Sequence, residues 1–355
     1  MVIGDLDRDA PMLADLATFL AAPFHRLTDL GDPFSAVSLA GALVFAALLA
    51  LRRPGAAPGR PGFAPRLARL RAFARAGFAR RVWAHPSAKL DYRLFFVTTF
   101  FYATGAVELV VTSKAVEQGV IGGLEHLVGR LDHAPAGIAT VALVTVLDLL
   151  IFELAYWFAH WLLHRVPTLW AFHALHHSAE VLTPFTEWRQ HPLELFLFPA
   201  INALFLGTFF GLTHHLLGAD AQPLSLFGFD VLQFAAVMTV LHLRHTHLWI
   251  TLPGFWAKLF QTPAHHQIHH SADPRHFDKN LGLFLSVWDW AFGTLWIPRP
   301  EEKTTLVLGL GEGKGHHGVV DAWVSPCIEA ARTLAPTLFP PDAVAGPAPV
   351  RPPAE

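Results

Sequence analysis

The sequence is poor in cysteine, in charge and in basic residues near its start, and each of these features excludes a class of protein. Its 355 residues include one cysteine, Cys327, which excludes an internal disulfide and a metal site built on cysteines. Charged residues make up 15% of the chain, against about 25% in average proteins, and a net charge of −2 gives no reason to expect nucleic-acid binding. The first 20 residues have acidic rather than basic character, so we expect no cleavable signal peptide.

Apolar residues are abundant and occur in long runs. They make up 53% of the chain, and the aromatic residues include 29 Phe and 11 Trp. Five segments approach the roughly 20 mostly apolar residues that a membrane-spanning helix needs. These segments cover residues 34–51, 94–112, 136–159, 193–217 and 224–241. We therefore predict an all-α fold, a polytopic integral membrane helical bundle with about four to five transmembrane or re-entrant helices.

Basic residues indicate how these spans are oriented. The segment 52–81 carries nine arginines, and such residues near span ends face the cytoplasm. The second span then leaves the cytoplasm and the third returns, so His160 emerges on the cytoplasmic side. The last two spans lead out and back, so His242 emerges there too. We expect a multi-pass protein of a bacterial inner membrane or an equivalent membrane, with a histidine-rich helical cap in the cytosol.

The chain divides into five predicted segments, of which the fourth carries the histidines. In chain order they are a non-cytoplasmic segment (1–33), the first transmembrane helix (34–51), a basic cytoplasmic linker with an amphipathic helix (52–90), a catalytic domain (91–300) and a C-terminal extension with a disordered Pro- and Ala-rich tail (301–355).

The feature that points to chemistry is clustered histidine. Thirteen of the 22 histidines fall within residues 160–177 or 242–276, in the motifs HWLLH (160–164), HALHH (173–177) and HQIHH (266–270). Residues three and four apart lie on one face of a helix, so HxxHH aligns three imidazole rings and HxxxH aligns two. Eight rings are roughly what two metal ions sharing a site require. They belong to His160, His164, His173, His176, His177, His266, His269 and His270.

Imidazole ligands alone leave the metal open among zinc, copper and iron. The sequence contains no HExxH motif, which disfavours a zincin-type peptidase. Two iron or two zinc ions fit the number of imidazoles, and iron is preferred if the site performs O2 chemistry on an unactivated C–H bond. Glu153 lies about two helical turns before His160 and inside a predicted span, where ionisable groups are usually functional. We expect Glu153 to orient a ligand.

Two stretches of the sequence resemble a known family. The stretch 148–194 contains Tyr156-Trp157, HWLLH, Leu169-Trp170, HALHHS, Arg189 and His191-Pro192, and the stretch 262–294 contains TPAHHQIHHSADPRHFDKNLG and WDWAFGT. This set resembles the fatty acid hydroxylase/sterol desaturase superfamily over roughly residues 90–300. Its motifs look most like the branch that includes alkylglycerol monooxygenase and bacterial sterol-desaturase-like proteins.

The resemblance implies a non-haem centre of two iron ions on the cytosolic membrane face, with O2 as co-substrate. It assigns the eight motif histidines as ligands. It also implies a ligand at the cytoplasmic end of the last span, where His245 matches best and His242, three residues earlier on the same helical face, is a further candidate. We expect no catalytic side chain beyond the metal ligands.

Four residues near the ligand motifs are expected to support the ligands rather than bind metal. His276, Asp278 and Asn280 follow HQIHH closely, and His191 follows HALHH. Metal-bound imidazoles usually donate their second N–H to a neighbouring acceptor, which is the role we expect for this set.

The function expected from these features is O2-dependent hydroxylation or desaturation of a C–H bond in a lipid such as a sterol, hopanoid, fatty acyl or ether lipid. The alternatives are an ether-lipid-cleaving monooxygenase of the same superfamily and, from a different class, a membrane metal transporter or metal-binding protein. No dinucleotide fingerprint is visible, so electrons must come from an external ferredoxin, cytochrome or flavin reductase. The other expected partners are the lipid substrate and membrane lipid.

Overall fold

The structure is almost entirely helical. The computed structural model describes residues 35–52, 63–103, 112–311, 315–316 and 318–335, together with positions 21, 24, 25 and 28. Within these residues the one sheet is a hairpin of β1 (Ser225–Leu226) and β2 (Phe229–Asp230). The helices are α2 (Ala36–Arg52), α3 (Phe63–Gly77), α4 (Arg80–Trp83), α5 (Pro86–Ala103), α6 (Ser113–Val128), α7 (Ile138–Arg165), α8 (Pro167–His177), η2 (Pro184–Trp188), α9 (Pro192–Leu217), α10 (Val231–Ala236), η3 (Val237–Leu241), α11 (His242–Arg244), α12 (Trp256–Leu259), α13 (Pro263–His269), η4 (Pro274–His276), α14 (Val287–Phe292), α15 (Glu302–Thr305) and α16 (Val319–Leu334). The helical part of the predicted fold class is therefore confirmed.

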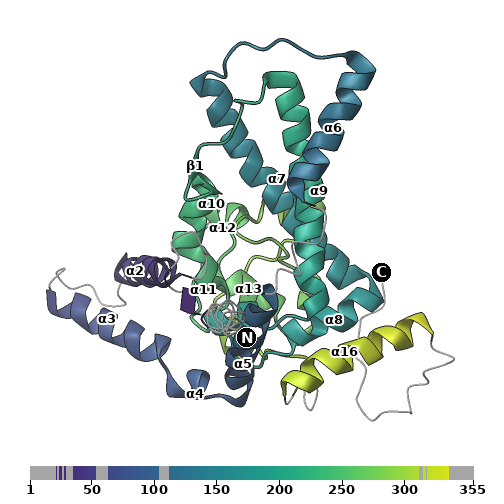
Figure 1. The fold of residues 1–355 in the computed structure, drawn as a ribbon. Helices are drawn as coiled ribbons and strands as arrows, with labels where there is room; N and C mark the ends of the chain where they lie inside the picture. The colour runs from purple at the N-terminus through teal and green to yellow at the C-terminus, as the bar shows by residue number, and fades with distance from the viewer. Residues whose placement is uncertain are drawn as a thin grey trace, which may run out of the picture.

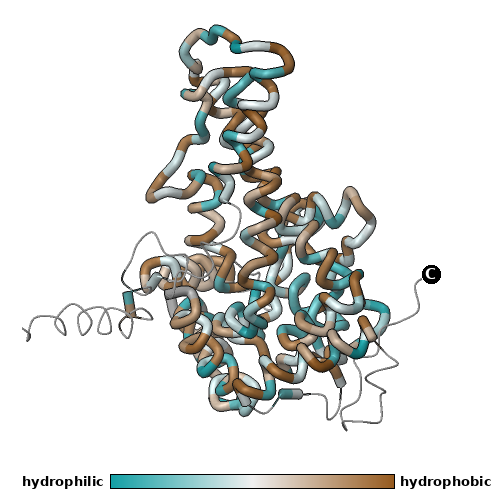
Figure 2. The backbone as a smooth tube through the Cα atoms, turned by 45° about the vertical axis from the view of Figure 1, so that its right-hand side comes forward, coloured by the Kyte–Doolittle hydropathy of each residue, from teal (hydrophilic) through white to brown (hydrophobic). Residues whose placement is uncertain are grey.

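Helices α6, α7 and α9 project together from the body of the molecule (Figure 1). Of these, α7 has 28 residues and α9 has 26, and only 28% of the most apolar window of each is buried inside the protein. Hydrophobic residues predominate along this projection (Figure 2). A long apolar helix whose surface is mostly exposed needs an apolar surrounding, and both helices have the length and composition to cross a membrane.

Two glycines let α6 approach α9 closely. A Cβ atom added at Gly207 would lie 2.5 Å from the backbone oxygen of Ser113, and one added at Gly211 would lie 2.6 Å from Cβ of Val120. Neither position has room for a side chain, so the two helix backbones pack directly against each other. Small residues play this part in membrane helix pairs, where close packing replaces the hydrophobic effect as the driving force.

The helices correspond only in part to the predicted spans. Of the five predicted segments, 136–159 corresponds to α7 from its first residue, Ile138, and 193–217 lies within α9, whereas α2 is a shorter apolar helix of 17 residues. The segment 94–112 overlaps the end of α5, and residues 104–111 lie outside the described residues.

The predicted helical span 224–241 is wrong in its first half. A turn with positive φ at Phe227 (52°) and Gly228 (84°) closes the β1–β2 hairpin there. The helix begins only after Asp230, whose Oδ1 atom accepts a hydrogen bond from the backbone N–H of Leu232 at 2.7 Å. An aspartate in this position is a strong helix N-cap, which an apolar-window argument overlooks.

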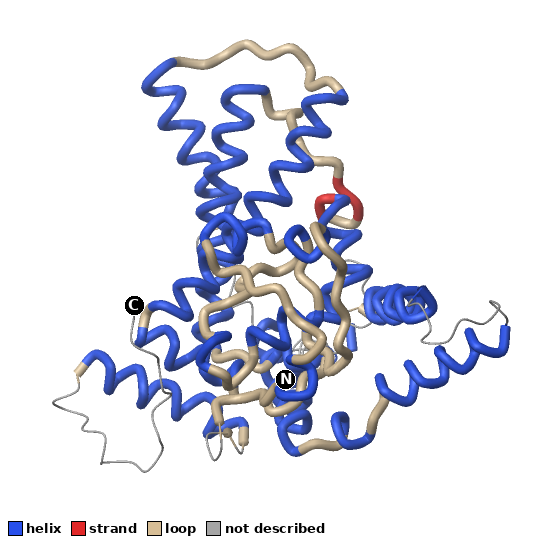
Figure 3. Tube along the Cα trace, turned by 180° about the vertical axis from the view of Figure 1, so that it is seen from behind, coloured by secondary structure: helices blue, strands red, loops and turns tan. Residues whose placement is uncertain are grey.

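Short helices and long loops make up the body below the projecting helices (Figure 3). Helix α16 packs there against α8, and Ala322 of α16 shares a small core with Leu90, Leu94 and Leu175. The predicted C-terminal extension thus contributes a packed helix to the body. Its Pro- and Ala-rich tail, residues 336–355, and the predicted segment 1–33, apart from four isolated positions, lie outside the described residues.

A buried ion pair joins α5 to the segment that follows α8. Nε of Arg189 donates to Oδ1 of Asp91 at 2.6 Å, and both side chains are almost completely buried. Arg189 also donates to the backbone oxygen of Ser87 at 2.7 Å, and Thr186 donates to Asp91 at 2.7 Å. Each charge is therefore surrounded by hydrogen-bonding partners, as a buried ion pair requires.

The packing of α6 on α9 predicts opposite effects for two glycine substitutions. Gly207→Ala should lower the free energy of unfolding by about 1–3 kcal/mol, because its methyl group would overlap Ser113 and Val116. Gly119→Ala on the exposed side of α6 meets nothing within 4 Å and should not destabilise, because alanine favours helix. Thermal unfolding of the two purified variants in the same detergent tests this, and equal melting temperatures would refute the close contact.

Candidate metal centre

Nine buried histidines from the end of α7, from α8 and from the segments of α11 and α13 gather in one place. Their ring nitrogens form two groups, and within each group one nitrogen from every ring lies within 4.8 Å of the others. The group of five contains His160, His164, His173, His177 and His269, and the group of four contains His176, His245, His266 and His270. All eight motif histidines thus come together, and His245 joins them.

Helical spacing divides each HxxHH motif between the two groups. On α8, His173 and His177 enter the group of five while His176 enters the group of four. The α13 motif does the reverse, since His266 and His270 belong to the group of four and His269 to the group of five. Rings four residues apart point the same way, and the ring between them is rotated toward the neighbouring group. One motif therefore serves both groups.

The outer nitrogen of several rings is held by an oxygen acceptor. Nδ1 of His160 lies 2.7 Å from the backbone oxygen of Leu281, and Nδ1 of His269 lies 2.8 Å from that of Lys279. Carboxylates hold two more rings: Nδ1 of His173 lies 2.7 Å from Glu194, and Nδ1 of His245 lies 2.9 Å from Glu187. These acceptors require a proton on Nδ1, which leaves the lone pair on Nε2.

The lone pairs on Nε2 then face one another at short range. The Nε2 atoms of His160 and His173 are 3.1 Å apart, and so are those of His245 and His176. His176 also has its Nδ1 on an acceptor, 3.3 Å from the backbone oxygen of Arg189. If each Nδ1 carries the proton, neither ring of a pair can donate to the other. Two facing lone pairs repel unless a cation lies between or beside them, so the residues fit a metal ion in each group.

Three further inner nitrogens support the same conclusion. The Nε2 atoms of His164, His177 and His269 are buried and have no hydrogen-bond partner. A buried polar atom without a partner costs free energy, so native proteins rarely retain one without a reason. All three belong to the group of five, where a metal ion would give each a partner.

Burial keeps these rings in the neutral form that binds metal. It holds the pKa of His176, His177 and His266 well below the ordinary histidine value, and neighbouring imidazoles lower it further. The same causes apply to His269 and His270. At neutral pH these imidazoles are therefore unprotonated, and binding a metal ion does not require the loss of a proton from them.

A charged cluster supports His245 from outside the group. Arg244 donates to both carboxylate oxygens of Glu187 at 2.9 Å and to the hydroxyl of Tyr156 at 2.7 Å. Burial acts to raise the pKa of Glu187, but the adjacent Arg244 outweighs it and holds that pKa well below its ordinary value. Glu187 is therefore a carboxylate, and its Oε2 atom lies 2.9 Å from Nδ1 of His245.

The structure does not bring His242 into either group. Its Nε2 atom lies 2.9 Å from the hydroxyl oxygen of Ser38 on α2. The expectation that His242 and His245 share a helical face is wrong, because helix α11 ends at Arg244 and His245 has non-helical dihedrals (φ −89°, ψ 62°).

Of the predicted supporting residues, Asp278 lies closest to a ligand. Its Oδ1 atom is 3.3 Å from Nδ1 of His164. Asn280 holds the backbone instead, donating to the oxygen of His265 at 3.1 Å and accepting from the N–H of Trp296 at 2.8 Å.

The other three supporting candidates make their hydrogen bonds, within the described part of the chain, to groups other than the motif histidines. Glu153 accepts from the backbone N–H groups of Phe284 and Leu285 at 3.0–3.2 Å, so it fixes a loop. His191 caps α9, and its Nε2 lies 3.0 Å from the oxygen of Trp323. The third, His276, has its ring against Trp296 and its Nε2 3.8 Å from Glu302.

Sequence reasoning missed three carboxylates near the centre. Glu194 and Glu187 contact the ligands His173 and His245 directly. Asp289 accepts from the N–H groups of Leu281 and Gly282 at 2.8 and 2.9 Å, in the loop whose carbonyl holds His160. Glu194 follows HALHHS by only 16 residues, and Asp289 lies inside the WDWAFGT motif. Each is an acidic residue beside an apolar run, and this was the sequence signal that could have identified them as supporting residues.

Comparison with known proteins confirms the family resemblance. Residues 145–294 match the family model described as fatty acid hydroxylase. The chain is 28% identical to alkylglycerol monooxygenase of Caenorhabditis elegans over 153 residues, 42% of this chain and 26% of that protein. It is 32% identical to ornithine lipid hydroxylase OlsE of Rhizobium tropici over 167 residues, 47% of this chain and 46% of that protein. The alignments thus span less than half of each relative, and no solved structure matches the chain.

The positions of His245 and His242 predict different metal contents for two matched substitutions. His245→Asn should lose roughly half of the bound metal, because only the group of four loses a ligand. The change His242→Asn should retain full metal content, since this ring lies outside both groups. Elemental analysis of the purified variants measures both, and metal loss in the His242 variant alone would reverse the assignment.

The contact between Glu194 and His173 predicts a positioning role. One carboxylate oxygen of Glu194 accepts from the His173 ring and the other accepts from the backbone N–H of His191. In Glu194→Gln a single amide oxygen cannot accept from both. Metal affinity should fall about 10–100-fold while the fold is retained. Competition with a chelator measures it, and the exposed Glu180→Gln variant is the control. Unchanged affinity would show that Glu194 acts only as part of the helix cap.

Proposed function

We propose that this chain, whose residues 145–294 form a fatty acid hydroxylase domain, is a membrane oxidoreductase that uses O2 and two iron ions to hydroxylate or desaturate a lipid. The observation that carries this proposal is the pair of imidazole groups at the buried end of α7. Nine ligands divided five and four suit two ions, whereas a single structural zinc site needs about four. The relatives named as monooxygenase and lipid hydroxylase support the reaction class.

The protein's own residues hold the metal ions in position, bind them without adding negative charge and keep water away from the site. Two bound iron ions together with O2 would supply the oxidant for an unactivated C–H bond. Neutral imidazoles hold both sites without adding negative charge, and the acceptors on Nδ1 fix the plane of each ring. The half-buried side chains of Trp170, Phe198 and Tyr156 have their rings against His164 and His160 and restrict water near the site. Electrons come from an external donor protein or reductase.

The two long apolar helices support a position at the membrane. His160 and His164 lie in the last turns of α7, so the imidazole groups are at the end of an apolar helix rather than at its middle. The nine arginines of residues 52–81 favour the cytoplasmic side for this end. A lipid can then reach the site from the bilayer while an electron donor approaches from the cytosol.

Alkylglycerol is a second candidate substrate, favoured by the matches to alkylglycerol monooxygenases over the histidine-rich region. Insertion of one oxygen atom from O2 at the carbon next to an ether oxygen gives a hemiacetal, which breaks down to an aldehyde and an alcohol. Hydroxylation of an acyl chain instead gives a stable alcohol, and removal of two hydrogens from it gives an alkene. Product analysis with an alkylglycerol and with a phospholipid therefore separates the two candidates.

A metal transporter would need polar residues near the middle of the membrane. The nine grouped histidines lie instead at one end of α7, and their inner nitrogens face one another rather than a path across the bilayer. Metal entry into liposomes without O2 uptake would favour transport and refute the oxygenase.

The proposed function predicts that one histidine from each group is indispensable. In membranes containing the iron-loaded protein and a ferredoxin with its reductase, lipid-dependent O2 uptake should fall at least about 100-fold in His176→Ala and in His269→Ala, because each ion loses a ligand. His126→Ala, an exposed histidine in the last turn of α6, should retain activity. Bound iron is measured in the same preparations. Full activity in either ligand variant would contradict the proposal.

A further inference from the structure

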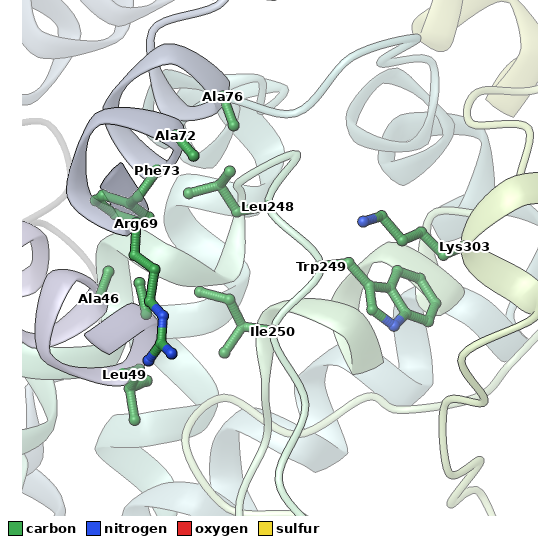
Figure 4. A pocket seen from close by; sticks show the side chains of 11 residues that line it. Ala46, Leu49, Arg69, Ala72, Phe73, Ala76, Leu248, Trp249, Ile250 and Lys303 are labelled. Carbon is green, nitrogen blue, oxygen red and sulfur yellow. The ribbon is translucent and has the colours of Figure 1, made fainter. Parts of the chain in front are cut away.

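A cavity lies between α2, α3 and the loop 248–250 (Figure 4). Helices α2 and α3 lie outside residues 145–294, the region that matches the family model, whereas the loop 248–250 lies inside it. Its volume is about 400 Å³, and most of its lining is apolar, including Phe73, Trp249 and Ile250. The two charged residues among those that line it are Arg69 from α3 and Lys303 from α15, and both are cationic. We call it the basic cavity.

The two cations of the basic cavity stand on different walls. In Figure 4 the side chain of Arg69 lies beside Leu49 and that of Lys303 lies near Trp249, on the other side of the opening. Arg69 donates to the backbone oxygen of Leu51 at 3.1 Å, which holds the guanidinium at the end of α2. The nearby carboxylate of Glu302 accepts from Trp296 and from the N–H of Arg299. A ligand that touches both cations would therefore meet net positive charge.

A second cavity adjoins the first. It has a volume of about 570 Å³ and a lining almost wholly of apolar side chains from α2, α10, η3 and residues 250–263. Leu49 and Ile250 line both cavities, so the two are neighbours across these side chains. Its lining also includes Thr262 and Pro263, where α13 begins. We call it the apolar cavity, and part of its wall is the start of the helix that carries His266 and His269.

The wall of the apolar cavity contains an irregular helix. Thr239 and Val240 line it, and they belong to η3, a π-helix. Such segments are rare and often occur at functional sites because they interrupt regular helical packing. Here η3 leads directly into α11 and His245. The cavity wall is thus continuous in the chain with a ligand of the metal centre.

We propose that these two cavities together hold one phospholipid with an anionic headgroup. Its phosphate lies between Arg69 and Lys303, and one acyl chain lies in the apolar cavity. Guanidinium and ammonium groups are the usual protein partners of phosphate, and an apolar cavity joined to a cationic one matches an anionic amphiphile. The proposal rests on the proposed function and names its substrate class: the acyl chain of an anionic phospholipid, presented to the metal centre from the side of α13.

The headgroup contact is tested by lipid binding, which requires neither metal nor O2. The delipidated protein in detergent is titrated with phosphatidylglycerol or with phosphatidylcholine, and bound lipid is counted by native mass spectrometry. Phosphatidylglycerol should bind more tightly, and Arg69→Gln with Lys303→Gln should weaken it about tenfold or more. The control is Arg71→Gln with Arg75→Gln, which removes the same charge from the exposed face of α3. Equal weakening in both double variants, or no preference between the lipids, would overturn the proposal.

The acyl-chain contact has its own variant. Ala235→Trp fills part of the apolar cavity and should weaken phosphatidylglycerol binding, whereas Leu204→Trp on the exposed surface of α9 should not. Glycerol phosphate, which has no acyl chain, should bind weakly and be insensitive to Ala235→Trp. Tight binding of glycerol phosphate would indicate a free phosphate ligand instead and refute the lipid assignment.

Oxygenation assays separate this inference from the proposed function. The wild-type protein should add one oxygen atom to, or remove two hydrogens from, phosphatidylglycerol in mixed vesicles, and the Arg69/Lys303 double variant should raise KM more than it lowers kcat. Oxidation of another lipid but not of phosphatidylglycerol would overturn the substrate class and leave the oxygenase standing. Binding of phosphatidylglycerol without oxidation of any lipid would instead refute the oxygenase.

Discussion

The centre depends on one constraint: nine imidazole rings are buried together and must point their lone pairs inward. A neutral imidazole has one donor and one acceptor nitrogen, so an inward lone pair requires an outward N–H with its own acceptor. The backbone oxygens of Leu281, Lys279 and Arg189 and two glutamates provide these acceptors. Without these acceptors, a ring could rotate and point its N–H group into the site. An N–H group has no free lone pair, so it cannot bind a cation.

The loop after α13 has its shape because of this requirement. Residues 278–285 contain two positive-φ positions, Asp278 (57°) and Asn280 (56°). Each directly precedes a residue whose carbonyl oxygen meets a ring, Lys279 at His269 and Leu281 at His160. Such backbone is strained for non-glycine residues, and asparagine and aspartate tolerate it best. Two buried carboxylates hold the loop through its N–H groups, Asp289 in its middle and Glu153 at its end. Both act on the metal site through the backbone.

Much of the centre could be predicted from the sequence because helical spacing is a local property. The HxxxH and HxxHH motifs fix which rings share a face, and all eight of those rings meet in the structure. The prediction that each HxxHH motif presents its three rings together is wrong, because the ring in the middle of each motif belongs to the other group. This division depends on how α8 and α13 are packed, which no spacing rule within one helix contains. Glu187 and Glu194 were missed for the same reason: each reaches its histidine from another element, and no spacing rule relates them.

The errors arose where a regular helix was assumed. His242 and His245 would share a face if α11 continued, but the chain follows the π-helix η3 into three residues of α-helix and then leaves it. The apolar run 224–241 looked like one span, although Asp230 and the Phe227–Gly228 turn divide it. Both errors lie in the segment that forms the wall of the apolar cavity.

The arrangement of the two cavities implies that α2 and α3, which precede the region matched by the family model, help to select the lipid. Arginine-rich α3 contains no acidic residue, and such a helix settles at an anionic membrane surface. If α3 lies there, Arg69 is at the level of the lipid phosphates, and an acyl chain that enters the apolar cavity extends from that level toward α13. The carbon that reaches the metal centre is then set by its distance along the chain from the phosphate. The region that matches the fatty acid hydroxylase model would supply the oxidation, and the helices that precede it would decide which carbon is oxidised.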